Sequence, residues 1–365
     1  MFVERFMAWA VAQPSSVRAE GIADLTAAYR TDQVADQDIE ATEQVFTLFL
    51  DDPDIVVRRA LSAGLATSDR APRALIWSLM NDIFTVAEPI FARSTRLTSA
   101  ELTNAATSGS SAIATLIAGR SLLDGQVVRA IAKDGCADAV EALLHNRTII
   151  LGSGLLDEVA QRFADDGAIR NALLDQPQIS AISRHRLAAA AAADMAKLTI
   201  GNATRIAAVA SDALDKATVE IATQCDVADL SIYAAHLSEQ NVITPSLLVR
   251  SICVGNAALF ETMFATATLT NLSRVQSIMD DSRRSAFRAL CKKANLPVAS
   301  LPLFEAALSN WTLCDDPMDM VEALLAAVEG EELVDGALVG LLGRIASELH
   351  RNQSRRPDQL LLAAA

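Results

Sequence analysis

The sequence is poor in aromatic residues, which make up only 4% of its 365 positions, although 51% of the residues are hydrophobic. Its apolar content is therefore mainly Ala, Leu, Ile and Val, and Ala and Leu are strong helix formers. Glycine and proline are also scarce, with 15 and 10 residues. A loop-rich all-β fold needs more turn residues than this, so the composition predicts an all-α protein.

Positive charge is in short supply as well. Lys and Arg number 31 against 45 Asp and Glu, which gives a formal net charge of −14. A chain this acidic repels phosphate backbones, and the few aromatic rings offer little surface for stacking bases. We therefore expect no nucleic-acid partner.

The chain also lacks paired cysteines and clustered histidines. Its five cysteines are scattered, with no CxxC spacing, and its four histidines lie far apart in sequence. Such a set predicts buried thiols in a reducing compartment instead of a disulfide framework, and it supports no structural zinc site. We expect no metal and no cofactor.

Long apolar runs are missing too, because no stretch approaches eighteen consecutive apolar residues. The start, MFVERFMAWAVAQPSS, has the outward look of a signal peptide, but Glu4 interrupts its charged region and its apolar core is short. The spacing of Phe2, Phe6 and Trp9 fits an amphipathic helix better. The sequence thus predicts a cytoplasmic protein with no membrane association.

What the sequence does contain is a repeat. Apolar anchors recur at intervals of 30, 27, 27 and 29 residues, at Val56, Val86, Ile113, Val140 and Ile169. Second helical patterns start at Thr98, where Glu101 completes a capping box, after Asp124, and at Ser153. A helix pair this short cannot bury both of its apolar faces alone and must stack on its neighbours. We predict an all-α fold, an α-solenoid of short helix pairs in two halves.

The second half repeats less clearly. Thr244 and Pro245 mark one helix start, and Asp316 and Pro317 mark another. An alanine run ends at Gly201-Asn202, a typical helix stop. We therefore predict an N-terminal repeat domain (residues 1–200), a C-terminal helical domain (201–350) and a flexible tail (351–365).

The stretch DDPDIVVRRALSAGLA (residues 51–66) resembles the first helix of a HEAT-type repeat, with an acidic turn, a Val-Arg pair and then Ala and Leu at helical spacing. The longer run 56–102 resembles a bacterial HEAT-like helical-repeat family filed as a domain of unknown function (DUF2336-like). The likeness is good over the first two hundred residues and weak beyond them. It implies an all-helical soluble bacterial protein, sometimes accompanied by signalling domains, and it implies no catalytic residues. Because these units are shorter than ordinary HEAT repeats, superhelix curvature is not carried over.

Three arginines recur in register: Arg93, Arg120 and Arg147 are spaced by 27 and 27 residues, each followed by Ser or Thr. In a stacked array they would line up as a ladder facing an acidic peptide or a phosphate. The alternative is that each bonds the carbonyl end of a helix or an acid in the next repeat, because cations favour helix C-termini.

A second group of cations, Arg284, Arg288 and Lys292, falls at i, i+4 and i+8 and predicts a basic stripe on one helix. In so acidic a chain, this stripe would dock an acidic partner or a second copy. The alternative is a solvated helix face balanced by Asp280 and Asp281.

Arg58 and Arg59 lie about 100° apart on a helix and cannot point the same way. We expect one of them to pair with Asp52 or Asp54 and the other to face solvent. Glu88 takes the place of Arg58 in the next unit, which argues against a shared anion-binding ladder there.

For four further residues the sequence predicts whether the side chain is buried or exposed. Trp77 and Trp311 would anchor an interface if exposed, but such residues more often lie in the core. His185, between two arginines, is expected at the surface, and Cys136 is expected as a buried thiol in a tight turn.

Catalytic motifs are missing. Ser110-Ser111 lack the strand-turn-helix context of a nucleophile elbow, and there is neither a Gly-rich phosphate loop nor HExxH. The sequence favours a non-catalytic protein-binding scaffold or adaptor with a protein partner, in bacterial signalling or regulation. The alternatives are a glycosylase-type enzyme acting on nucleic-acid bases and a small-molecule sensor, and self-association is compatible with all three.

Overall fold

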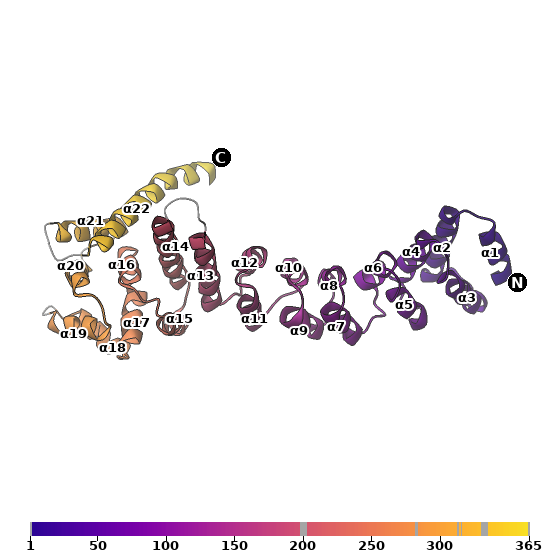
Figure 1. Cartoon of the computed structure of the whole chain (residues 1–365), viewed down its shortest axis with the longest axis horizontal. Coiled ribbons are helices and arrows are strands. Elements are labelled where there is room, and N and C mark those ends of the chain that lie inside the picture. The colour runs from indigo at the N-terminus through magenta and orange to yellow at the C-terminus, as the bar shows by residue number, and fades with distance from the viewer. Residues whose placement is uncertain are drawn as a thin grey trace. The chain divides into compact units, whose positions relative to one another are not determined.

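The computed structural model (Figure 1) describes residues 2–197, 203–281, 284–311, 314, 316–329 and 335–363. All regular elements in these ranges are helices, which confirms the all-α prediction. Contacts divide the chain into two compact units, Met1–Ile179 and Ser180–Ala365.

The first unit holds twelve α-helices among its described residues and one short 3-10 helix, η1 (Asp36–Asp38). They are α1 (Phe2–Val11), α2 (Ser15–Arg30), α3 (Ile39–Phe49), α4 (Ile55–Leu65), α5 (Arg73–Met80), α6 (Phe84–Arg93), α7 (Ser99–Ser108), α8 (Ser111–Ala118), α9 (Gly125–Asp134), α10 (Ala137–His145), α11 (Ser153–Phe163) and α12 (Gly167–Leu174).

In this unit, helices two apart in the chain are neighbours in space. One row runs α2, α4, α6, α8, α10 and α12, each in contact with the next, and a second row contains α7, α9 and α11. Within each helix pair, α7 also contacts α8, α9 contacts α10, and α11 contacts α12 (Figure 1). Each helix pair therefore packs on the pair before it and the pair after it.

The core of the first row is aliphatic and recurs at helical spacing. Its fully buried members include Val57 and Leu61 in α4, Val86 and Ile90 in α6, Ile117 in α8, Val140 in α10 and Ile169 in α12. Val56 itself is 57% exposed. The choice of Val56 as the first anchor was therefore wrong by one residue, and Val57, 29 residues before Val86, is the true equivalent.

Helix starts follow the capping residues expected from the sequence. Thr98 forms the full capping box with Glu101, and Asp124 accepts a hydrogen bond from the backbone of Gln126. Ser153 is the first residue of α11, and its N-cap is Gly152. These local bonds satisfy backbone N–H groups that a helix start leaves unpaired.

The second unit holds ten α-helices among its described residues and η2 (Val298–Ser300). They are α13 (Ala181–Lys197), α14 (Ala203–Thr223), α15 (Val227–Glu239), α16 (Pro245–Cys253), α17 (Ala257–Ala267), α18 (Leu272–Met279), α19 (Ser285–Lys293), α20 (Leu301–Asn310), α21 (Pro317–Val328) and α22 (Gly336–Ala363).

The boundary between the units lies at 179/180, about twenty residues before the predicted position 200. The reason is packing: the alanine-rich α13 contacts α14 and α15, so it belongs to the second unit. The predicted stop at Gly201-Asn202 lies outside the described residues. Helix α22 continues to Ala363, so the backbone of the predicted tail is helical through that residue.

The core of the second unit is richer in aromatic rings. Phe260 and Phe264 lie with ring centroids 4.9 Å apart, and Phe304, Phe287 and Trp311 surround them. Trp311 is half-buried on Phe260, so it packs as a core residue. Most of the chain's few aromatic side chains thus serve packing, which makes an exposed aromatic residue informative.

Candidate functional site

Trp77 is the exposed aromatic residue that stands out. It lies on α5, between the buried residues Ile76 and Leu79, and is 55% exposed. The expectation that Trp77 is a core residue is therefore wrong. Exposing a large indole costs hydrophobic free energy, so its position calls for an explanation.

A groove runs beside this indole. It is lined by Arg73, Trp77 and Met80 of α5, by Arg96 and Leu97 of the connection after α6, and by Glu101 of α7. Its volume is about 250 Å³. Pockets for whole small-molecule ligands usually hold about 300–1,000 Å³, so this groove suits one or two side chains of a peptide.

The stacking of helices does not require a tryptophan here. In α3, α5, α7, α9 and α11, two buried residues four apart flank one position: Thr42 and Phe46, Leu75 and Leu79, Leu102 and Ala106, Val128 and Ala132, and Leu156 and Ala160. The residues between them are Gln44, Trp77, Asn104, Ala130 and Glu158. Four of these five helices have a polar or small residue at this position, so the packing of the helices does not require a tryptophan there.

The charges around the groove are unevenly satisfied. Arg73 Nη2 lies 2.7 Å from Glu101 Oε1. Burial acts to raise the pKa of Glu101, but hydrogen bonds from Thr98 and the ion pair with Arg73 hold it below its ordinary value. Arg96 differs: its Nε is buried and has no hydrogen-bond partner among the described residues. The groove thus offers an apolar ring next to a guanidinium whose Nε has no hydrogen-bond partner among the described residues.

The structure separates the three recurring arginines. Arg93 is the last residue of α6 and is exposed, and Arg147 is exposed in the connection after α10. Arg120 turns into the stack, where Nη1 donates to the carbonyl oxygen of Phe91 at 2.7 Å and Nη2 to that of Ser94 at 2.7 Å. Burial lowers the pKa of Arg120. These three side chains therefore do not form one ladder.

A different set of side chains makes the hydrogen bonds that recur from one helix pair to the next. Asn146 Nδ2 donates to the carbonyl oxygens of Ala118 and Arg120, both at 2.8 Å, and Gln176 Nε2 donates to that of Leu144 at 2.9 Å. Like Arg120, both side chains donate to backbone carbonyl groups at the end of the first-row helix in the preceding helix pair. One helix pair after Arg120, Asn146 makes these hydrogen bonds in place of an arginine, and its neighbour Arg147 is exposed.

Arg58 is bonded within the fold, whereas the side chain of Arg59 is 53% exposed and faces solvent, as expected for one of the two. Arg58 makes a two-pronged ion pair with Asp82, at 2.7 and 3.1 Å, and donates to the carbonyl oxygen of Asp52. Arg59 lies 3.6 Å from Glu88. The predicted partner carboxylates were wrong, because Asp52 binds Arg18 instead. With the anchor moved to Val57, Glu88 is the equivalent of Arg59 and also its partner.

The predicted basic stripe is not continuous. Arg284 is the N-cap of α19, with a left-handed φ of 54°, and its Nη1 donates to the carbonyl oxygen of Met279 at 2.7 Å. Arg288 forms a two-pronged pair with Glu305. Lys292 is exposed in the last turn of α19. Only Lys292 of the three is left to face solvent without a described partner.

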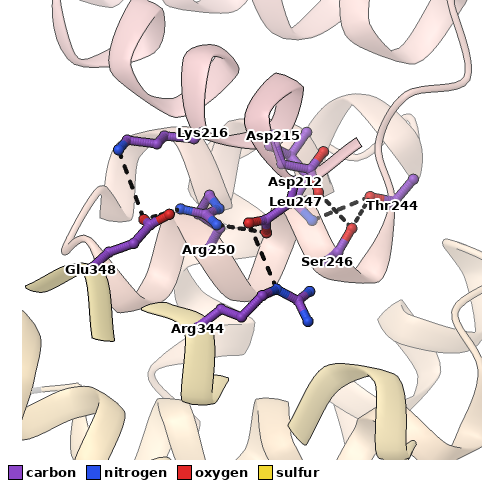
Figure 2. Close-up of polar contacts among 9 residues, drawn as sticks. All are labelled: Asp212, Asp215, Lys216, Thr244, Ser246, Leu247, Arg250, Arg344 and Glu348. Atoms are coloured by element: carbon purple, nitrogen blue, oxygen red, sulfur yellow. Dashed lines mark hydrogen bonds and ion pairs between the residues drawn. The ribbon is translucent and has the colours of Figure 1, made fainter. Parts of the chain in front are cut away.

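The second unit contains a buried charge cluster (Figure 2). Arg250 of α16 is only 2% exposed and lies between Asp212 of α14, at 2.7 Å, and Glu348 of α22, at 3.1 Å. Arg344 lies 3.7 Å from Asp212, and Lys216 lies 3.9 Å from Glu348. Burial acts to lower the pKa of Arg250, but its two carboxylate partners raise it above its ordinary value. The cluster therefore joins α14, α16 and α22 through permanent charge.

Asp215, one turn from Asp212, completes this arrangement. Burial raises its pKa, and it accepts a hydrogen bond of 2.6 Å from Ser246 Oγ. Ser246 is in turn bonded to Thr244, the N-cap of α16 (Figure 2). Sequence reasoning missed this cluster because its members come from helices more than thirty residues apart. The one available signal was an arginine in the middle of an apolar helix.

Two cysteines and one histidine of the second unit are buried. Burial raises the pKa of Cys253 and Cys291 to about 12, so both remain protonated thiols at neutral pH. His185 is 3% exposed, not at the surface as expected, and its Nε2 has no described hydrogen-bond partner. Cys136 also departs from expectation, because it is exposed at the N-cap of α10.

Within the described ranges, no three His, Cys, Asp or Glu residues are grouped so as to hold a metal ion. In the same part of the chain, no helix has the length and apolarity to span a bilayer.

One family matches the chain, described as an uncharacterised protein conserved in bacteria (DUF2336), over residues 86–333. The match starts later than the resemblance over 56–102 suggested and extends through most of the second unit, where the likeness had been expected to be weak. Trp77 and Arg73 lie just before it, and Arg96 lies within it. No curated protein and no solved structure matches the chain.

Proposed function

This chain is a member of the DUF2336 family, and we propose that it is a non-catalytic scaffold that binds another protein in the groove beside Trp77. The observation that carries the proposal is the exposed indole on α5, at a position where α3, α7, α9 and α11 have Gln, Asn, Ala and Glu. Exposed tryptophans next to a pocket are typical anchors of protein interfaces.

We further propose that the first unit is an α-solenoid of short HEAT-like helix pairs. The row of contacts from α2 to α12 and the recurrence of Arg120, Asn146 and Gln176 support this. Such arrays present extended surfaces to their partners. The partner is expected in the bacterial cytoplasm, where the five free cysteines would stay reduced.

Two observations weigh on the alternatives, one for each. A glycosylase needs a basic face, but Arg284 and Arg288 of the predicted stripe are occupied with Met279 and Glu305. A sensor needs a pocket for a whole ligand; the groove beside Trp77 is smaller than the usual range, whereas the pocket lined by Ile252, Trp311 and Met320 holds about 330 Å³, at the lower end of that range.

Site-specific photocrosslinking in the native bacterium tests the proposal. A benzoylphenylalanine replaces Ala74, which lines the groove, and a control replaces Ser78, an exposed residue of α5 that does not line it. We expect one protein to crosslink from Ala74 and not from Ser78, and to be lost when Trp77→Ala is added. Because Trp77 is 55% exposed, this substitution should cost clearly less than the about 3–5 kcal/mol typical of a buried tryptophan. Identical crosslinks from both positions would refute the proposal.

A further inference from the structure

We infer that the groove beside Trp77 binds a segment of another protein in which an acidic residue lies next to a large apolar residue. This inference rests on the proposed function, since it names the class of partner for the same groove. The apolar residue packs on the indole, and the carboxylate pairs with Arg96.

The first argument is the state of Arg96. Its side chain is half-buried against the groove, and the described residues provide no ion pair and no hydrogen bond for it. A half-buried guanidinium without a counter-charge is costly to leave unpaired. Several half-buried or buried arginines of the first unit have acceptors: Arg58 has Asp82, and Arg120 has two carbonyl groups. Arg96 is therefore available for a ligand.

The second argument is the charge of the groove. Its titratable lining consists of Arg73, Arg96 and Glu101. The carboxylate of Glu101 is committed to Arg73 and to the capping box with Thr98. The remaining charge is positive, in a chain whose formal net charge is −14. A local positive site in an acidic protein selects an acidic ligand and disfavours a basic one.

The third argument is size. The groove of about 250 Å³ accepts one large side chain beside Trp77, and Arg96 is part of its lining. A guanidinium recognises a carboxylate through paired N–H donors, so a neighbouring Asp or Glu completes the contact. Neither a polyanion nor a purely apolar helix would use both features.

Phage display against the full-length chain is the test, using a random twelve-residue peptide library. Peptides are selected on the wild type and depleted on Trp77→Ala. We expect the survivors to carry Asp or Glu beside Phe, Trp, Leu or Met. The affinity of one such peptide is then measured by fluorescence anisotropy, with its acidic residue intact and replaced by the matching amide.

We expect Arg96→Gln to weaken the acidic peptide about tenfold, as loss of a charge-assisted bond at a partly buried site should. The amide peptide should bind the wild type about tenfold more weakly and should lose nothing further in Arg96→Gln. Arg93→Gln, three residues away and outside the groove, is the matched control and should bind as the wild type does. The amide peptide also tests the pairing without altering the protein, in case Arg96→Gln folds poorly.

The outcomes separate the inference from the proposed function. If no library peptide depends on Trp77, the groove is not a binding site and the proposed function fails. If the peptides depend on Trp77 but lack acidic residues, or bind Arg96→Gln unchanged, only the inference on partner class is overturned. A dimer of the wild type that Trp77→Ala abolishes would also overturn it, by assigning the groove to a second copy.

Discussion

His185 is a histidine that the fold keeps neutral. Burial, together with the nearby His236, lowers its pKa from 6.5 to about 4. Its ring lies against Tyr233, at 5.9 Å between centroids, and against His236, at 5.6 Å. Burial also lowers the pKa of His236, with Arg186 adding to the effect. The second unit therefore packs around uncharged imidazoles.

Stability should fall as the pH drops. The unfolded chain binds a proton at His185 near pH 6.5, whereas the folded chain binds it only near pH 4. The stabilisation is complete above pH 6.5 and is lost progressively as the pH falls toward 4. We expect about 2 kcal/mol less stability at pH 5 than at pH 7 from this group. Urea unfolding at the two pH values measures it.

His185→Phe should reduce that loss, because phenylalanine keeps the ring contact with Tyr233 and cannot be protonated. The matched control is His145→Gln, which changes an exposed histidine of the first unit and should leave the pH dependence as it is. An unchanged loss in His185→Phe would assign the effect to other groups.

Arg250 is a residue whose removal should be costly. Arg250→Met keeps much of the volume but leaves Asp212 and Glu348 facing an apolar side chain. Breaking a buried pair by deleting one partner typically costs about 3–5 kcal/mol. We expect the lower end, about 3 kcal/mol, because Arg344 and Lys216 remain near the two carboxylates.

The control for this prediction is Arg344→Met. Arg344 is 53% exposed and lies 3.7 Å from Asp212, and exposed pairs contribute about 1 kcal/mol or less. Urea midpoints at a constant denaturant slope compare the two variants. Equal losses would show that the cluster acts as a surface network and not through Arg250.

At the scale of the helix, the connections between units depend on donors that reach back to the preceding helix end. Arg120 satisfies carbonyl groups of Phe91 and Ser94, whereas Arg147, at the matching place one unit later, is exposed. Arg120→Met removes both bonds and should cost about 2 kcal/mol. Arg147→Met should stay within about 0.5 kcal/mol of the wild type. Thermal unfolding of the two variants makes the comparison, and similar melting temperatures would contradict it.

Helix positions were the most predictable feature of this chain. Thr98, Asp124, Thr244 and Asp316 mark helix starts in the sequence and cap helices in the structure. These signals are local, since a capping side chain bonds backbone only two or three residues away. Register was less certain: Val56 and Val57 look alike in sequence, and only packing against the next helix shows which one is buried.

The candidate site was much less predictable. Repetition in sequence suggested that Arg93, Arg120 and Arg147 share a role, but a shift of one residue at Asn146 moved that role from arginine to asparagine. Exposure of Trp77 depends on which face α5 turns to its neighbours. A usable signal existed in the sequence, because aligning the apolar pairs Leu75/Leu79, Leu102/Ala106 and Leu156/Ala160 places tryptophan opposite Asn104 and Glu158.

On the scale of the whole molecule, the two units have different cores. The first is built mainly from aliphatic residues repeated along a row of helices, and the second from a cluster around Phe260 and Phe264. The buried charge cluster and the neutral His185 both belong to the second unit. Each unit thus has its own means of stabilisation.

Because each core is formed within one unit, we expect the units to unfold independently. Native-state hydrogen exchange of the full chain, read by mass spectrometry, reports the two units in one experiment. Arg120→Met should speed exchange within residues 1–179 and leave the second unit unchanged, and Arg250→Met should do the reverse. With exchange expressed as protection relative to the intrinsic amide rate at each pH, a fall in pH from 7 to 5 should lower protection in the second unit as Arg250→Met does, because His185 lies in that unit. If either substitution speeds exchange equally in both units, they form a single cooperative structure, and the free energies predicted above would describe the whole chain.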